Sequence, residues 1–249
     1  KGRIQYSDNS DLMAFWTNST ERLRIDSSGN VGIGRVPTVV ESAYDSVQLG
    51  AGGTWLSGSS NFAAGHFGQN YYVDSAGASR YLGNDEAERI TMNNGYISFE
   101  TAPTNSGGAG AALTWSESMR IDSSGNLLVG KTAASGSTQG VELRTDGRLL
   151  AVSTSDFAGY FNRKSTDGEI VRFVKDTTTV GSIRSISGDS IGVGNGNAGL
   201  RFVSATNRIQ PVNMSNGLNS DGLTDLGDTN KRFQDLYLSG GVYLGGTGS

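Results

Sequence analysis

Apolar and polar residues alternate along much of the 249-residue chain, and this period-two pattern predicts β-strands. It is clearest in a heptapeptide, Arg-Ile-Asp-Ser-Ser-Gly-Asn, that occupies residues 24–30 and again residues 120–126. In each copy the alternation stops at the small and polar residues and resumes after them, which predicts a β-hairpin with one apolar face and one polar face. The apolar face comprises Leu23, Ile25, Val31 and Ile33 in the first copy and Met119, Ile121, Leu127 and Val129 in the second.

Turn residues between the alternating stretches support these hairpins. We expect Gly29 and Asn30 to take the positive-φ positions of a tight connection, where a bulky side chain would clash. A degenerate copy at residues 88–99 has the same order of strand, Asn-Gly turn and strand. The Asp-Gly pair at residues 146–147 predicts the clearest two-residue hairpin in the chain.

The C-terminal half continues the same pattern. Residues 170–174 are predicted to pair with 180–186, and residues 191–193 with 200–203. No stretch shows helical periodicity over three turns, and residues 230–236 are the one candidate for a short helical turn. The sequence therefore predicts an all-β fold, built as an array of β-hairpins and small β-domains.

Composition limits how such a fold can bury its sheets. Leu, Ile, Val and Phe make up only about 22% of the chain, close to the level below which chains are often disordered. The 37 glycines and three prolines suit many tight turns in sheets that keep their ladder hydrogen bonds. A sheet with so few apolar residues can bury its apolar face against identical neighbours, so we expect a homo-oligomer whose shared core contains the eight apolar residues of the two repeat copies.

Several classes of function are disfavoured by composition. The chain has no cysteine, so disulfides and cysteine-based metal sites are excluded. No apolar run approaches the roughly 18 residues that a membrane helix needs, so we expect no membrane insertion. The net charge of −4, with scattered basic residues, gives no basic footprint for nucleic acid.

Two stretches carry a family resemblance. Residues 21–34 resemble the repeat of bacteriophage tail fibres, especially those of marine and cyanobacterial phages, and residues 224–246 resemble the module that leads into a C-terminal tip or intramolecular chaperone. The resemblance implies an elongated, intertwined and parallel homotrimeric fibre on the virion, outside the host cell. It also implies other phage tail proteins and a host cell-surface glycan or protein as partners, and it transfers no catalytic residue.

Changes in composition divide the chain into four predicted segments. Residues 1–37 form an N-terminal β-repeat, and residues 38–135 form a loop-rich β region that ends with the second copy of the repeat. Residues 136–222 form a β-hairpin shaft domain, and residues 223–249 form a C-terminal connector to a tip module. Glycine-rich and small-residue stretches mark these boundaries.

The candidates for catalytic chemistry are weak. The single histidine, His66, could serve a Ser-His-Asp hydrolase, but the chain has no G-x-S-x-G elbow. Residues 194–199 spell G-x-G-x-x-G, yet a strand pattern follows them where a dinucleotide site needs a helix. The acids Asp85, Glu86 and Glu88 lie in a predicted exposed turn without the spacing of a calcium loop.

We therefore expect no enzymatic activity, no cofactor and no metal site. Two alternatives to a phage tail fibre stay open at this point. One is a tailspike-type glycan depolymerase on a trimeric β scaffold, and the other is a non-phage adhesin or surface structural protein.

The densest aromatic stretch lies between the two repeat copies and offers a candidate contact for a receptor. Aromatic rings stack on the apolar faces of sugars while short polar side chains bind the hydroxyl groups, so this stretch suits a glycan. The alternative is that the rings fill the core of the trimer. The residues concerned are Trp55, Phe62, His66, Phe67, Tyr71, Tyr72 and Tyr81.

Overall fold

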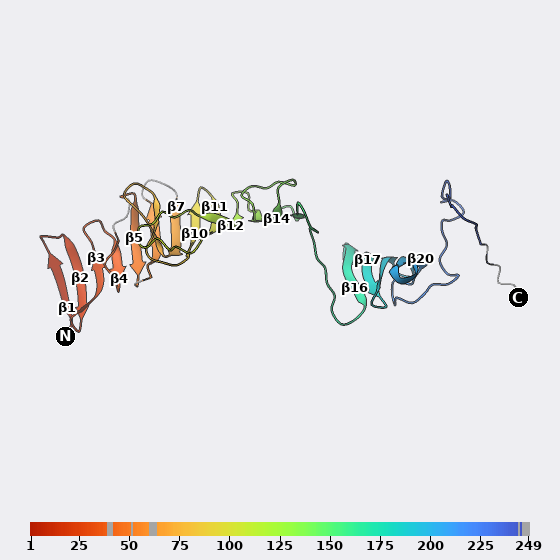
Figure 1. The fold of residues 1–249 in the computed structure, drawn as a ribbon, viewed down its shortest axis with the longest axis horizontal. Helices are drawn as coiled ribbons and strands as arrows, with labels where there is room; N and C mark the ends of the chain where they lie inside the picture. Colours follow the sequence, from red (N-terminus) through yellow and green to blue (C-terminus); the bar gives the residue numbers. More distant parts are fainter. Residues whose placement is uncertain (39–41, 51, 60–63, 244, 246–249) are drawn as a thin grey trace. The chain divides into compact units, whose positions relative to one another are not determined.

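A computed structural model describes residues 1–38, 42–50, 52–59, 64–243 and 245, and it confirms the all-β fold (Figure 1). Within this described part of the chain, the one helical element is a single 3₁₀ turn, Ser204–Thr206. The chain divides into two compact units, Lys1–Ala158 and Gly159–Ser249. The sheet of the first unit runs on through the boundaries predicted near residues 37 and 135.

Thirteen strands of the first unit form one sheet, in an order that follows the sequence except that β7 pairs with β10 (Figure 1). Neighbouring strands are antiparallel, apart from the parallel pair β4 and β5. The strands are β1 (Arg3–Ser7), β2 (Leu12–Thr17), β3 (Thr20–Ile25), β4 (Val31–Ile33), β5 (Tyr44–Leu49), β6 (Thr54–Ser59), β7 (Ala64–Gln69), β10 (Ala87–Asn93), β11 (Tyr96–Ala102), β12 (Ser116–Ile121), β13 (Leu127–Val129), β14 (Gly140–Leu143) and β15 (Leu149–Val152).

A separate hairpin, β8 (Tyr71–Val73) and β9 (Ser79–Tyr81), lies over one face of this sheet. Its Tyr71 ring stacks on Trp55 of β6, with ring centroids 4.9 Å apart and planes at 10°. The Trp115 indole N–H donates to the Ser79 hydroxyl at 3.1 Å, which ties the hairpin to the chain just before β12. The hairpin thus covers the sheet face on which Trp55 lies.

The two identical repeats form the predicted hairpins. Leu23 of β3 lies opposite Ile33 of β4, and Met119 of β12 lies opposite Val129 of β13. The expectation for the turn was partly wrong, because Gly29 has a φ of 85° while Asn30 does not adopt the left-handed region. One glycine is enough here, since the connection is longer than a two-residue turn.

Asn30 closes its turn with its side chain. The Asn30 amide donates to Asp26 Oδ2 at 3.3 Å, and its Oδ1 accepts the Ser46 backbone N–H and hydroxyl at 3.2 and 2.9 Å. In the second copy, Asn126 Oδ1 accepts the Thr145 backbone N–H at 3.2 Å. Each asparagine therefore links its turn to the strand or turn that follows, which gives the repeated turn a structural role.

The two-residue hairpin predicted at residues 146–147 was wrong. Leu143 pairs with Leu149, so five residues connect β14 to β15. The glycine of this connection has a φ of 85° and donates its N–H three residues back, as in the repeat turns. Residues 74–78 form the same turn between β8 and β9. The turn geometry thus recurs where the repeat sequence does not.

The second unit contains a five-stranded antiparallel meander. The predicted pairs in this region are confirmed, and residues 194–199 form the tip of the β18–β19 hairpin, in which Gly196 and Asn197 connect the two strands. The helical turn expected at residues 230–236 is absent, because Asp228 and Lys231 form an isolated β-bridge there. The strands are β16 (Gly168–Lys175), β17 (Thr178–Ile186), β18 (Ser190–Asn195), β19 (Ala198–Val203) and β20 (Arg208–Pro211).

Candidate functional site

One face of the thirteen-stranded sheet is apolar, and the described residues of the first unit leave it uncovered. Strand register places the predicted assembly residues, which are the eight apolar residues of the two repeats, on this face. The same face continues between the two repeats across β5, β6, β7, β10 and β11. Ile25 and Ile121 are 37% and 41% exposed. Every strand of the sheet contributes an exposed large apolar side chain to this face: Ile4, Met13, Ile25, Ile33, Leu49, Leu56, Phe67, Met92, Ile97, Ile121, Val129, Val141 and Leu149.

Leu23, Val31, Met119 and Leu127, the remaining predicted assembly residues, are half-buried on the same face. Their neighbours in the sheet partly cover them, while no other layer of the described part of the first unit lies over them. All eight residues predicted from the repeats therefore share one face.

The second sheet has the same arrangement. Its paired positions place Phe173, Ile183, Val193, Leu200 and Ile209 on one face, one from each strand. All except Ile183 are exposed. Within the described residues, the main sheet of each unit thus presents an uncovered apolar face with contributions from every one of its strands.

Both apolar faces are hollowed. A cavity of about 450 Å³ in the first unit is lined by Phe67, Ile90 and Phe99, among others. A second cavity of about 600 Å³ in the other unit is lined by residues that include Phe202 and Ile209. Hollows of this kind are suited to receive apolar side chains from a partner.

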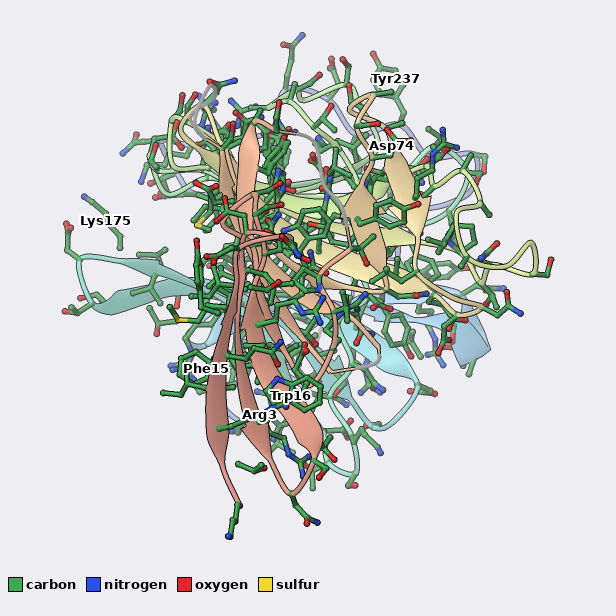
Figure 2. All side chains as sticks on the ribbon, turned by 90° about the vertical axis from the view of Figure 1, so that its left-hand side faces the viewer. Arg3, Phe15, Trp16, Asp74, Lys175 and Tyr237 are labelled. Atoms are coloured by element: carbon green, nitrogen blue, oxygen red, sulfur yellow. The ribbon has the colours of Figure 1, made fainter. Side chains whose placement is uncertain are left out.

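The opposite face of the first sheet carries polar and aromatic side chains. Figure 2 shows Phe15 on one side of the first strands and Arg3 and Trp16 on the other, where the Arg3 guanidinium lies 4.4 Å from the centre of the Trp16 ring. Glu21 pairs with Arg24 at 2.7 Å, and the equivalent Glu117–Arg120 pair recurs in the second repeat. Sequence alternation predicted this polar face but not its ion pairs.

The most buried ion pair joins Lys131 to Glu142. The Lys131 ammonium lies 2.7 Å from a Glu142 carboxylate oxygen, and both side chains are almost completely buried. Arg144 binds the other carboxylate oxygen at 2.6 Å. Hydrogen bonds from Lys131 and then Arg144 lower the pKa of Glu142 to about 2. The small-residue loop around Ser135 closes over this pair, since its backbone N–H also donates to Glu142.

Three of the predicted receptor-contacting aromatic residues are core residues of the single chain. Trp55, Tyr71 and Tyr81 are 1%, 0% and 4% exposed. Trp55 and Tyr71 stack, and Trp115 meets the edge of Tyr71 at a centroid distance of 4.9 Å. The prediction that these three rings contact a receptor is corrected here, because the β8–β9 hairpin buries them against the sheet.

The other aromatic candidates lie in different places. Phe67 is exposed on the apolar face, and Tyr72 is partly buried against the aromatic core. His66 is 6% exposed and lines a cavity on the polar face. Phe62 lies outside the described residues. The stretch that is continuous in sequence is therefore divided between two faces and a core.

The His66 cavity has a volume of about 530 Å³ and lies between the sheet and the β8–β9 hairpin. The sheet contributes Tyr44, His66, Arg89, Thr91, Asn93, Tyr96 and Glu100, and the hairpin contributes Val73, Gly77 and Ser79. Strand register shows that these sheet residues lie on the face opposite the exposed apolar side chains. The cavity is the site that sequence reasoning missed, since it needs residues from six strands.

A chain of polar contacts orders the cavity. The Thr91 hydroxyl donates to Glu100 at 2.8 Å, and Arg89 forms an ion pair with the same carboxylate. His66 Nδ1 lies 3.2 Å from the Thr91 hydroxyl oxygen. Burial, followed by the charge of Arg89, lowers the pKa of His66 to about 4, so the imidazole is neutral near pH 7. The Arg89 guanidinium lies 4.3 Å from the centre of the Trp115 ring, which fixes its position.

The remaining candidates for chemistry are separate from this cavity. Asp85 and Glu86 are exposed, and a hydrogen bond from the Thr104 hydroxyl is the main cause that lowers the pKa of Glu86 to about 2. Glu88 accepts a hydrogen bond from Gln69 at 2.7 Å. Across the described ranges, no group of three or more His, Asp or Glu residues is placed to hold a metal ion. None of the described helices is long and apolar enough to cross a membrane.

Comparisons with known proteins do not add an assignment. No protein-family model, curated protein or solved structure matches the chain.

Proposed function

We propose that the chain is a structural component of a bacteriophage tail fibre, in which three parallel copies form a shaft that contributes to host attachment. The observation that carries the proposal is the uncovered apolar face to which each of the thirteen strands contributes. Burial of apolar surface stabilises association by about 25 cal/mol per Å². A monomer that left such a continuous face in water would forgo this stabilisation and would tend to aggregate.

In an assembly with closed symmetry, every copy can bury the same apolar face. In a three-fold arrangement, each chain directs the same apolar face toward a shared axis, and no face is left unpaired. Parallel chains bring identical residues to the same height, so that Ile25 meets Ile25 and Ile121 meets Ile121. The three-fold and parallel features come from the resemblance of residues 21–34 and 224–246 to tail fibres.

This arrangement gives the chain a mechanical role without catalysis. A shared apolar seam resists shear, and three copies of any attachment surface bind a host cell-surface glycan or protein with avidity. The proposed location is the tail fibre of the virion, outside the cell, in contact with other phage tail proteins. Nucleic-acid binding and membrane insertion have no part in this role.

Antibody labelling of phage particles tests the proposal. Antibodies raised against the purified chain should label tail fibres of the phage whose genome encodes it, and they should slow adsorption to host cells. Antibodies against a capsid protein of the same phage serve as the control for labelling and adsorption. Labelling that is restricted to the capsid, or no labelling of intact particles, would contradict a place in the fibre.

A further inference from the structure

We propose that the cavity formed by Tyr44, His66, Arg89, Asn93, Tyr96 and Glu100 binds a neutral saccharide. The inference deepens the proposed attachment role, and it rests on that role for the supposition that copies of the chain cover the apolar face. The cavity lies on the opposite face, so an assembly along the apolar face leaves it open. Its volume of about 530 Å³ falls within the range of about 300 to 1,000 Å³ of small-molecule sites.

The hydrogen-bond network assigns the tautomer of His66. The Thr91 hydroxyl has one proton and donates it to the Glu100 carboxylate at 2.8 Å. Its oxygen therefore accepts from His66, which places the imidazole proton on Nδ1. The other ring nitrogen, Nε2, is then an acceptor, and it suits a hydroxyl donor of a ligand.

Charge balance favours an uncharged ligand. Arg89 and Glu100 form an ion pair, so the two formal charges of the cavity neutralise each other. His66 adds no charge near pH 7. An anionic or cationic ligand would have no unpaired charge to meet, whereas hydroxyl groups can both donate to and accept from these side chains.

The other lining residues suit both the C–H groups and the hydroxyl groups of a sugar. The rings of Tyr44 and His66 lie 5.7 Å apart at an angle of 50°, and Tyr96 adds a third ring that supports Arg120 at 4.3 Å. Such rings offer faces for the C–H groups of a pyranose. The Asn93 amide lies beside them and supplies a donor and an acceptor for hydroxyl groups.

Saturation-transfer NMR on the full chain tests this site. The probes are methyl β-D-galactoside, methyl β-D-glucoside and N-acetylglucosamine, with N-acetylneuraminic acid as the charged comparison. We expect at least one neutral probe to bind at millimolar concentration and the acid to bind more weakly. Absence of binding by all three neutral probes, or stronger binding by the acid, would overturn the assignment.

Variants at Asn93 locate the binding. Asn93→Trp fills the cavity and should abolish the signal, while Asn93→Ala should weaken affinity about threefold to tenfold by removing a hydrogen bond. Asn9→Trp and Asn9→Ala, in the exposed turn between β1 and β2, are the matched controls and should bind like the parent. Near-UV circular dichroism checks that each variant is folded. If both folded Asn93 variants bind like the parent, the saccharide does not occupy this cavity.

Light scattering on the same samples separates this inference from the proposed function. Trimers that bind no neutral probe would overturn the saccharide site and leave the shaft intact. A folded monomer would overturn the shaft, and the comparison of Asn93 with Asn9 variants would still decide the site.

Discussion

The two units leave the same kind of face uncovered but cover the other face differently. In the first unit, the β8–β9 hairpin packs the rings of Trp55 and Tyr71 against the sheet and leaves a polar cavity beside them. In the second unit, the chain after β20 lies over the sheet. There Val212 and Met214 pack against Ile186, and Met214 also lies close to glycines of the sheet. Glycines allow this close approach because they have no Cβ.

This difference separates the apolar face, which the proposed assembly needs, from the polar cavity, which occurs in one unit only among the described residues. The apolar face is common to both units, as the role that we propose for the whole chain requires. The cavity occurs where a hairpin covers polar side chains, and the second unit has tight packing at the corresponding face. The proposed saccharide site therefore belongs to the first unit, whereas both units carry the apolar face on which the proposed shaft depends.

The largest expected effect comes from a charge on the shared face. Ile121→Asp, or Ile25→Asp in the other repeat, should convert the assembly into monomers or misfolded chains, because three carboxylates would be buried without partners. Light scattering measures the mass of each variant. Ser123→Asp places the same charge in the exposed turn of the same hairpin and should leave the mass unchanged. Unchanged assembly and melting in both isoleucine variants would show that these side chains do not face a partner.

A second strong effect is expected inside the first unit. Lys131→Met leaves the buried Glu142 carboxylate without its closest cation, and the Tm should fall on the order of 10 °C. Lys175→Met, at the exposed end of β16 (Figure 2), is the control and should change the Tm little. Calorimetry that finds equal changes for the two variants would show that the buried pair does not stabilise the unit.

A moderate effect is expected in the second unit. In Gly199→Ala, the new Cβ would lie 2.5 Å from Met214 Cγ and 2.7 Å from its sulfur, so the unit should lose about 1–3 kcal/mol of unfolding free energy. Gly240→Ala has no atom within 4 Å of its new Cβ and serves as the control. Urea unfolding measures both variants. A Gly199→Ala protein as stable as the control would show that Met214 is not packed against β19.

The smallest effect concerns acid. Protonation of His66 is disfavoured in the folded chain, where its pKa is about 4, whereas the unfolded chain takes up the proton near the ordinary value of 6.5. Stability should therefore be complete above about pH 6.5 and should fall as the pH drops toward about 4. Urea midpoints of the parent should decrease across this window, and those of His66→Gln should decrease less. Parallel curves for the two proteins would contradict a buried neutral imidazole.

Local signals in the sequence predicted the hairpins well. Leu23 and Ile25 alternate with polar residues, and Gly29 supplies the one positive φ that the turn needs, so pattern and turn chemistry agree. Even so, the role of Asn30 was misread, because it bonds to Ser46, sixteen residues later. The five-residue connection after Leu143 was missed for a similar reason, since strand pairing decided where the turn began.

The coverage of each face depends on contacts between distant residues. The alternation in β6 does not reveal that the β8–β9 hairpin will bury Trp55 and Tyr71. These two rings were therefore predicted to lie at the surface and contact a receptor. The cavity joins His66 to Thr91 and Glu100, which are 25 and 34 residues away along the chain. No local pattern brings such residues together. The composition, in contrast, predicted a shortage of core residues, and the uncovered apolar faces agree with that expectation.

The mass of the purified protein in solution, measured by light scattering, tests the central claim most directly. The shared apolar face predicts an oligomer, and the resemblance to tail fibres predicts three copies, so we expect a species with three times the 26.1 kDa mass of one chain that is stable on dilution to low micromolar concentration. A well-folded monomer of about 26.1 kDa would contradict the account, because its apolar faces would then be stable in water without a partner.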